Sequence, residues 1–492
     1  MNNHLKAPLR RTRIIATLGP ATDGEGVLED LIRAGVDVVR LNFSHGAPEH
    51  HAQRAAAVRN IAHRLGREVG VLVDLQGPKI RIEKFAEGKV LLKAGQAFAL
   101  VCKADAPLGD INQVPMSYLG LVNDVVVGDT LLLDDGLVTM RVERIEDQTI
   151  HCTVLTDGAL SNRKGLNRLG GGLSLGALTD QDREHIKDAA KIDADFLAVS
   201  FCRSAADMHE ARALALAAGA RPHLVAKIER TEAIAALGEI IDASDAVMVA
   251  RGDLGVEIGD AELPGLQKKI IRESLARNKV VITATQMLQS MVDNPIPTRA
   301  EVLDVANAVI DGTDAVMLSQ ESASGQFPIK AVESMVRICL GAERQFEMDT
   351  DFEKAPRNLQ RVDQAIAMAS MFLAEHIKVR AIIALTESGG TARYLSRFRA
   401  QVPIFALSRH EPSRRRMAMM RDVVPINFDS RGLPGRQAAR EAIKHLFGLG
   451  LLNDGDRVLI TSGDHMEQHG ATNTLRLLEV GPGGQAEGLG TL

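Results

Sequence analysis

LVAKIERTEAI (Leu224–Ile234) and DAVMVARGDLGVE (Asp245–Glu257) are the two stretches that decide the fold. Each contains a short apolar run that predicts a buried strand. Because side chains alternate faces along a strand, Lys227 and Glu229 are expected to project to the same side. Asp253 follows the second strand between two glycines, which let the backbone approach a ligand closely. One lysine and two carboxylates are therefore expected at the same ends of two successive strands.

These three charged groups fit a site for a divalent cation and a phosphate. Carboxylate oxygens suit a hard cation such as Mg²⁺, and an ammonium group suits a phosphate that the cation also contacts. For each residue alone the structural alternative is simpler, because Lys227 could pair with Glu229 and Asp253 could merely end a strand. The three residues together favour a functional site.

Strands and helices alternate eight times before residue 340. The predicted strands are Thr12–Leu18, Asp37–Phe43, Val69–Leu75, Asp195–Phe201, Pro222–Ile228, Ala246–Ala250, Val280–Ala284 and Ala315–Leu318. Helical patterns follow most of them, at Glu25–Ala34, Pro48–Leu65, Ala205–Ala218, Leu263–Asn278, Arg299–Ile310 and Ile329–Leu340. Strands apolar enough to be buried on both faces predict a (β/α)₈ barrel, with a doubly wound open sheet as the alternative.

The positions of the polar residues favour the barrel. Barrels place their active sites at the C-terminal ends of the strands. The polar residues at or just past these predicted ends are Arg40, Asn42, Ser44, His45, Asp74, Lys227, Glu229, Asp253, Thr283, Thr285 and Ser319.

The alternation is interrupted after the third predicted strand. From Lys79 onward the pattern is β-like and rich in turn signals, which predicts a small inserted β-barrel that acts as a lid. Beyond residue 360, four more strands alternate with helices and predict a C-terminal α/β domain. The expected division is a barrel at 1–78 and 178–346, the insert at 79–177, a linker at 347–360 and the C-terminal domain at 361–492. No regular structure is expected after Val480.

A second candidate site follows the predicted strand Ala381–Leu385. The loop contains Thr386, Ser388, Gly389, Gly390 and Thr391 and leads into a helix expected near Ala392. Hydroxyls, backbone N–H groups and a helix N-terminus can hold a phosphate. A helix cap by Thr391 after a tight turn explains the same residues equally well.

Composition excludes several classes of function. The 492 residues include 58 basic and 63 acidic ones, and the net charge of −5 argues against binding to nucleic acid or to anionic membranes. Aromatic residues make up 3% and Trp is missing, which weakens any base-stacking hypothesis. The four cysteines are too far apart for a CxxC motif, and the basic N-terminus is neither a signal peptide nor a membrane span. A reducing cytoplasm is the expected location.

Twelve motifs along the chain resemble those of the pyruvate kinase family. In order they are ATLGPAT (16–22), VVRLNFSHG (38–46), VDLQGPKIR (73–81), DDGL (134–137), KGLN (164–167), LTDQD (178–182), AVSF (198–201), KIER (227–230), VARGDLGVE (249–257), TATQML (283–288), NPIPTRAEV (294–302) and VMLSQESA (316–323). The family's fold, a barrel with an inserted lid and a C-terminal regulatory domain, agrees with the architecture predicted above.

The resemblance implies transfer of a phosphoryl group from phosphoenolpyruvate to ADP, which gives pyruvate and ATP. It implies Mg²⁺ or Mn²⁺ held by Glu229 and Asp253, a homotetramer, and a phosphorylated effector at the loop described above. The implied catalytic residues are Lys227, Arg40 and Thr285, and the implied substrate-binding residues are Arg40, Gly252, Asp253 and Thr285. The implied nucleotide-binding residues are Asn42, Ser44, His45, Arg81 and Lys164.

The resemblance also bears on potassium. Many family members bind K⁺ at the positions of Asn42, Ser44, Asp74 and the carbonyl of Leu75, with a glutamate at the position of Lys79. The segment here resembles the subgroup that works without the ion, so no K⁺ requirement is expected. A solvent-facing Lys79 is the alternative. Gln320 and the segment 168–172 also depart from the usual pattern of the family.

Two other functions remain to be compared. A Mg²⁺-dependent barrel lyase that acts on pyruvate or another 2-oxo acid would share Glu229 and Asp253, but it has no need for the lid or for Lys164. A non-catalytic nucleotide sensor would be expected to have lost the charged residues of the barrel site, which are all present here.

Overall fold

The computed structural model describes residues 10–345, 359, 361–398, 401–463 and 470–488. At its centre, eight parallel strands form a closed barrel in the order β1-β16-β15-β14-β13-β12-β3-β2. Their bounds are β1 Arg13–Thr17, β2 Val38–Asn42, β3 Gly70–Asp74, β12 Phe196–Val199, β13 His223–Ile228, β14 Ala246–Ala250, β15 Val280–Ala284 and β16 Ala315–Leu318. Because β1 pairs with both β2 and β16, the sheet closes on itself, which confirms the predicted barrel and excludes the open sheet.

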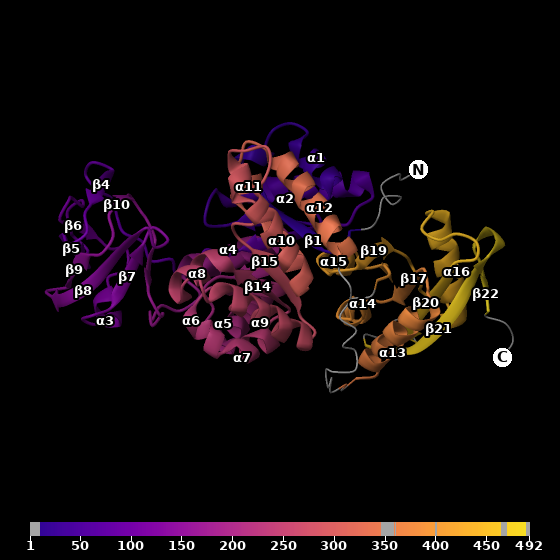
Figure 1. Ribbon diagram of the computed structural model, residues 1–492. Coiled ribbons are helices and arrows are strands. Elements are labelled where there is room, and N and C mark those ends of the chain that lie inside the picture. The colour runs from indigo at the N-terminus through magenta and orange to yellow at the C-terminus, as the bar shows by residue number, and fades with distance from the viewer. Residues whose placement is uncertain (1–9, 346–358, 360, 399–400, 464–469, 489–492) are drawn as a thin grey trace.

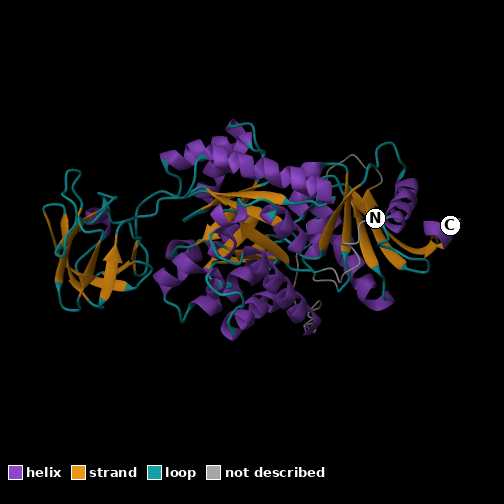
Figure 2. Cartoon of the chain, turned by 90° about the horizontal axis from the view of Figure 1, so that it is seen from above, coloured by secondary structure: helices purple, strands orange, loops and turns teal. Residues whose placement is uncertain are grey.

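Helices surround the barrel strands, as Figure 2 shows. They are α1 Val27–Ala34, α2 Pro48–Leu65, α4 Asp180–Lys191, α5 Ala205–Ala217, α6 Thr231–Ala235, α7 Leu237–Ala243, α8 Arg251–Ile258, α9 Leu263–Ala276, α10 Arg299–Asp311, α11 Gln320–Ala323 and α12 Pro328–Gln345. The strands are buried on both faces, which explains their nearly continuous apolar sequence. Within the described part of the chain, no helix is both long and apolar enough to cross a membrane.

The helix α8 differs from the expectation for this segment. Asp253 was expected to follow the strand 246–250 between two glycines, and no helix was predicted there, but a helix begins at Arg251, directly after β14. Arg251 stabilises this junction, because its guanidinium donates to Asp304 Oδ1 at 2.6 Å and to the carbonyl of Thr285 at 2.8 Å. The helix places Gly252 and Asp253 in its first turn, next to the C-terminal ends of the barrel strands.

The β-rich insert lies between β3 and β12 and projects to one side of the barrel (Figure 1). It contains β4 Lys89–Leu92, β5 Ala97–Val101, β6 Gln113–Pro115, α3 Leu121–Asp124, β7 Thr130–Leu133, β8 Val138–Glu146, β9 Thr149–Val154, β10 Gly158–Ser161 and β11 Leu166–Arg168. These strands form a six-stranded sheet, β11-β7-β8-β9-β5-β6, and a separate pair, β10-β4. The insert is therefore built from two sheets around its own core rather than from the single closed barrel expected.

The C-terminal domain lies on the other side of the barrel (Figure 1). Its elements are α13 Val362–Ile377, β17 Ala381–Leu385, α14 Gly390–Ser396, β18 Ile404–Ser408, α15 Glu411–Met417, β19 Val423–Asn427, α16 Gly435–Gly448, β20 Arg457–Gly463, β21 Thr472–Gly481 and β22 Gln485–Glu487. The sheet order is β19-β18-β17-β20-β21-β22. The expectation of no regular structure after Val480 is wrong, because β22 pairs antiparallel with β21. The expected linker at 347–360 falls almost entirely outside the described residues.

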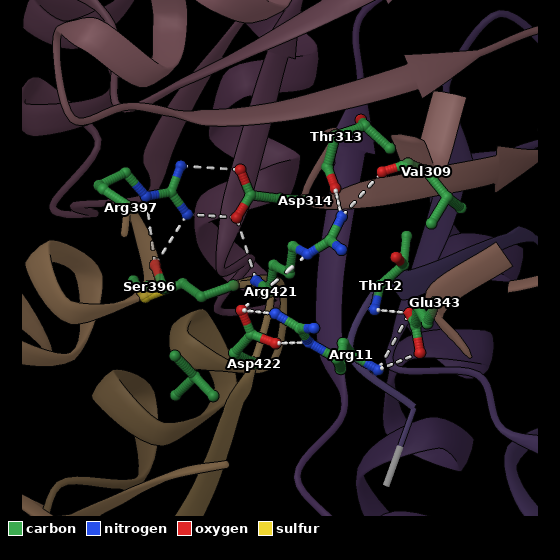
Figure 3. Close-up of polar contacts among 12 residues, drawn as sticks. Arg11, Thr12, Val309, Thr313, Asp314, Glu343, Ser396, Arg397, Arg421 and Asp422 are labelled. Atoms are coloured by element: carbon green, nitrogen blue, oxygen red, sulfur yellow. Dashed lines mark hydrogen bonds and ion pairs between the residues drawn. The ribbon is translucent and has the colours of Figure 1, made fainter. Parts of the chain in front are cut away.

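Buried ion pairs join the C-terminal domain to the base of the barrel (Figure 3). Arg397 lies just after α14 and pairs with Asp314, which precedes β16. The same carboxylate accepts the backbone N–H of Arg421 at 3.0 Å, and the Arg421 guanidinium donates to the carbonyl of Val309 at 3.0 Å. Arg11 pairs with Asp422 on the same interface. The two domains therefore share a continuous polar network.

Candidate active site

A small cavity opens at the C-terminal ends of β2, β3, β12, β13 and β14. Its volume is about 190 Å³. The residues that line it are Arg40, Asn42, Ser44, His45, Asp74, Leu75, Gln76, Lys79, Arg81, Ser200, Phe201, Lys227, Glu229 and Asp253. Most of the residues named from the sequence therefore meet in one place, although they are spread over more than two hundred positions.

Lys227 lies at the centre of the charged groups. Its Nζ lies 2.8 Å from Glu229 Oε1 and 3.3 Å from Asp74 Oδ1. It also donates to Ser200 Oγ at 2.7 Å. Burial would lower the pKa of Lys227, but the carboxylates of Asp74 and Glu229 raise it above its usual value. The lysine is consequently a fixed positive charge at neutral pH.

Arg40 and Asp74 form the second charged pair of the cavity. Arg40 Nε donates to Asp74 Oδ2 at 2.6 Å, and its NH1 donates to Thr17 Oγ1 at 3.1 Å. Burial would raise the pKa of Asp74, but Lys227 and Arg40 hold it below its usual value. Asp74 thus stays ionised and orients two cationic side chains toward the same space.

Glu229 and Asp253 are the two remaining carboxylates. Glu229 is buried, and its Oε2 accepts the backbone N–H of Phe201 at 2.8 Å. Burial raises the pKa of Glu229, an effect that Lys227 opposes and Asp253 reinforces. Asp253 Oδ1 accepts a hydrogen bond from Lys79 Nζ at 2.9 Å. The solvent-facing position considered for Lys79 is therefore excluded, because its ammonium pairs with Asp253.

The donor set fits a hard divalent cation. Among the described residues, no group of three or more His, Cys, Asp or Glu side chains gathers as a metal site. Two carboxylates alone are too few for a closed structural zinc site. Mg²⁺ commonly keeps several waters and binds through one or two carboxylates plus substrate phosphates. Glu229 and Asp253 are therefore the residues that would suit Mg²⁺ or Mn²⁺.

Thr285 and Gly252 lie beside this cavity but do not line it. The backbone N–H of Gly252 donates to Thr285 Oγ1 at 2.8 Å. Thr285 adopts a φ of 70°, a strained backbone conformation for a β-branched residue. Such strain is often found at functional sites, which favours a functional role for Thr285. Thr283 is fully buried and its hydroxyl contacts Thr313 at 3.1 Å, so it belongs to the buried core and not to the cavity.

Lys164 is a predicted nucleotide-binding residue that does not line the cavity. It belongs to the inserted domain, where its Nζ pairs with Asp134 at 2.8 Å. Arg81 is closer, because it lines the cavity and donates to the carbonyl of Arg163 at 3.0 Å. The structure thus brings Arg81 to the cavity and leaves Lys164 in the insert.

Sequence reasoning missed Ser200. Its hydroxyl lies 2.7 Å from the carbonyl of Leu75 and 3.3 Å from Asp74 Oδ1, and it also accepts from Lys227. Ser200 therefore links three of the predicted residues. The signal was present in the motif AVSF, where a serine follows a buried strand, but a serine at that position also fits a simple strand end.

The loop 386–391 borders a second cavity, of about 290 Å³, in the C-terminal domain. The cap predicted for Thr391 as an alternative is wrong, because Gly389 precedes α14 with a φ of 84° and no side chain caps the helix. Thr391 is buried within the helix, and its hydroxyl contacts Thr472 Oγ1 at 2.7 Å. Thr386, Ser388 and Gly390 line the cavity together with Arg361 and Arg393.

A closed (β/α)₈ barrel with cationic and acidic groups at its strand ends defines a barrel enzyme that acts on a phosphorylated substrate. Comparison with known proteins gives the family. The family model described as "Pyruvate kinase, barrel domain" matches residues 9–332 of the sequence. A second family model, "Pyruvate kinase, alpha/beta domain", matches residues 364–478. The chain belongs to the pyruvate kinase family.

Individual relatives agree over nearly the whole length. The chain is 52% identical to pyruvate kinase II of Salmonella typhimurium over 476 residues, which are 96% of this chain and 99% of the relative. It is 49% identical to the pyruvate kinase of Haemophilus influenzae, covering 95% and 97%. It is 40% identical to that of Geobacillus stearothermophilus, covering 95% and 80%.

Proposed function

We propose that this protein is a phosphotransferase that moves the phosphoryl group of phosphoenolpyruvate to ADP, forming pyruvate and ATP in glycolysis. The observation that carries the proposal is the cavity in which Lys227, Arg40, Glu229 and Asp253 meet at the barrel's strand ends. A coupled assay for pyruvate, with and without ADP, tests it. Pyruvate formed only with ADP supports the proposal. Pyruvate formed from a larger 2-oxo acid without ADP would indicate the lyase, and no turnover would indicate a nucleotide sensor.

Glu229 and Asp253 are proposed to hold Mg²⁺ or Mn²⁺. When bound, the ion would supply a compact positive charge that stabilises the negative charge of the substrate. Glu229 is oriented for this role by the backbone N–H of Phe201 and by Lys227. Asp253 is oriented by its place in the first turn of α8.

Lys227 is proposed to stabilise the phosphoryl group during transfer, and Arg40 to hold the phosphate of the substrate. Phosphoryl transfer gains mainly from positive charges that are in place before the reaction. Both cations are fixed by Asp74, whose two oxygens contact Lys227 and Arg40 separately. Gly252, Asp253 and Thr285 are proposed to bind the carboxylate side of the substrate, supported by the hydrogen bond between Gly252 and Thr285.

The nucleotide is proposed to bind beside the phosphate, through Asn42, Ser44, His45 and Arg81, with Lys164 arriving from the inserted domain. The first four residues share the cavity with Lys227. The insert is proposed to act as a lid, because it is inserted in the barrel chain between β3 and β12 and Lys164 would approach the cavity as it closes. Its boundaries, 79 and 177, stay a prediction.

The loop 386–391 is proposed to bind the phosphate of an effector. Arg393 lines the same cavity and provides positive charge for an anion. Arg361 also lines it, but its guanidinium pairs with Asp363. The loop leads into α14, and Arg397, directly after this helix, forms the buried ion pair with Asp314 of the barrel. The loop is therefore connected to the barrel through one short helix.

A homotetramer in the cytoplasm is proposed as the working form. Two groups of exposed apolar residues support association between copies, Ile296, Leu303 and Ile310 near α10, and Met368 and Phe372 on α13. The four cysteines are free and buried, which suits a reducing compartment. Analytical ultracentrifugation measures the oligomer, and Leu303→Arg with Phe372→Arg should reduce it to smaller species.

A further inference from the structure

The helix α8 contacts both connections between the barrel and the lid. The outgoing connection carries Lys79, whose ammonium binds Asp253 in the first turn of α8 at 2.9 Å. The return connection carries Gly170, whose backbone N–H donates to the carbonyl of Glu257 in the last turn at 3.1 Å. Both connections of the lid thus meet a single helix of eight residues, and that helix also carries a proposed cation ligand.

The return connection is attached away from the cavity. Glu257 is buried, and its Oε2 accepts the backbone N–H of Thr231 at 3.0 Å. The backbone N–H of Gly172 donates to Glu232 Oε1 at 2.5 Å. None of these groups lines the cavity at the strand ends. A ligand in the cavity therefore does not compete for this attachment.

The outgoing connection is attached inside the cavity. Lys79 and Asp253 both line it, and their side chains are 25% and 23% exposed. An ion pair with this much exposure is weak. A divalent cation bound to Asp253 carries charge of the same sign as the ammonium and repels it at short range. Cation binding and the Lys79 contact are therefore in competition for one carboxylate.

We propose that Lys79 is a positioning residue that acts through Asp253, lowering cation affinity and tying the outgoing lid connection to α8 until the cation displaces it. The inference rests on the proposed function, because it assumes that Asp253 binds the cation. Displacement frees the connection at Lys79 while Glu257 continues to anchor the return strand. The lid is then left with a single attachment to α8, and the released ammonium remains within the cavity.

The test is the binding of Mn²⁺, followed by the electron paramagnetic resonance of the free ion with the full chain and no substrate. Lys79→Met should bind Mn²⁺ roughly three- to tenfold more tightly than the parent. Lys79→Arg, which keeps the charge, should remain close to the parent. Arg81→Met is the matched control, because it removes a charge from the same cavity without contacting Asp253. Equal tightening in Arg81→Met, or weaker binding in Lys79→Met, would overturn the proposal.

Two further measurements separate this proposal from the metal site itself. Asp253→Asn should abolish Mn²⁺ binding with either residue at position 79, and binding that persists would refute the proposed metal ligand instead. Residues 80–82 pair with 164–166 inside the insert, so the segments compared are 77–79 and 170–172. Hydrogen exchange should rise on Mn²⁺ addition in residues 77–79 of the parent and stay constant in 170–172. In Lys79→Met, Mn²⁺ should leave both segments unchanged. Exchange at 77–79 that is insensitive to Mn²⁺ in the parent would overturn the release of the lid connection.

Discussion

Arg397 and Asp314 form an ion pair in which the guanidinium side chain is fully buried and the carboxylate is 1% exposed. Arg397 NH1 donates to Asp314 Oδ2 at 2.8 Å and also to the carbonyl of Lys279 at 2.5 Å. The pair crosses from the C-terminal domain to the base of the barrel, as Figure 3 shows. Asp314 accepts in addition the backbone N–H of Val281, at 2.9 Å, at the start of β15. A single carboxylate thus links two barrel strands to the neighbouring domain.

Removal of one partner of this pair should be strongly destabilising. Arg397→Met leaves a buried carboxylate without its main countercharge and should cost about 3–5 kcal/mol in the free energy of unfolding. Urea denaturation of the full chain measures it. The double variant Arg397→Met with Asp314→Asn should recover part of the loss, because it removes the unpaired charge. Arg183→Met, which breaks an exposed pair with Glu210, should change little. If Arg397→Met and Arg183→Met lowered the free energy of unfolding equally, burial would not explain the stability that the Arg397–Asp314 pair provides.

Sequence reasoning located most of the barrel because its strands are short, apolar and buried on both faces. The bounds of β14, β15, β16 and α2 were predicted as they are observed. β22 was missed, because it has only three residues, none with high strand propensity, lies between glycines and depends on pairing with β21. The start of α8 was missed for a related reason, since the glycines in RGDLG suggest a loop and tertiary contacts of Arg251 support the helix.

The sequence predicted which charged residues gather at the strand ends of the barrel, but not how they contact one another. Lys227, Glu229 and Asp253 were predicted to lie together because they end two successive strands. These strands, β13 and β14, are neighbours in the barrel. The pairing of Lys79 with Asp253 joins residues 174 positions apart, and it depends on how the lid connection crosses α8. No periodicity or spacing in the sequence reports such a contact.

Lys227→Met should separate the two halves of the proposed reaction. Without the ammonium, ADP phosphorylation should fall by roughly a thousandfold or more, because the main countercharge of the transferring group is lost. Loss of tritium from labelled pyruvate in the presence of Mg²⁺ should persist at least in part, since that step concerns the enolate. Lys187→Met on the surface of α4 serves as the control. Equal loss of both reactions would contradict the assignment of Lys227 to the phosphoryl group.

Cation affinity should depend on pH through Glu229. Burial raises the pKa of this carboxyl, Lys227 opposes the effect and Asp253 reinforces it. The metal binds the ionised form, so protons compete with it as the pH falls, and a raised pKa starts this competition at a higher pH than for an ordinary glutamate. Mn²⁺ binding measured from pH 8 to pH 5 should therefore weaken toward acid. An affinity that is constant over this range would contradict the participation of Glu229.

Replacement of Ser388 and Thr391 by Ala should abolish the response to a phosphorylated activator and leave maximal turnover unchanged. A ligand activates only by binding one conformational state better than another, so loss of its contacts removes the effect. A panel of sugar phosphates and nucleotides provides the activators. Thr472→Ala is a comparison variant that removes the internal partner of Thr391 and a lining hydroxyl outside the loop, so it separates the contribution of the loop from that of the rest of the cavity. Full activation of the double variant would assign the loop a purely structural role.

Turnover should be independent of K⁺. Four positions are implied for K⁺ by the resemblance described above, and three of them have oxygens that already accept hydrogen bonds or ion pairs. Asn42 Oδ1 accepts the N–H of Ser44 at 3.2 Å, Asp74 pairs with Arg40 and Lys227, and the carbonyl of Leu75 accepts the Ser200 hydroxyl at 2.7 Å. The Lys79 ammonium supplies a permanent positive charge in the same cavity, which replaces the charge that K⁺ would bring.

The measurement compares initial rates in tetramethylammonium buffer with and without KCl, at fixed ionic strength and free of NH₄⁺. The parent should change by less than about twofold, because its cavity already carries the lysine charge. Lys79→Glu should lose activity in the K⁺-free buffer and regain a large part of it with KCl, since the substituted carboxylate both removes the ammonium and offers an oxygen ligand. Arg81→Met, which lowers the cavity charge without adding a carboxylate, should show no comparable rescue. A large rise of the parent on addition of KCl would refute the idea, because it would mean that the lysine does not substitute for the ion.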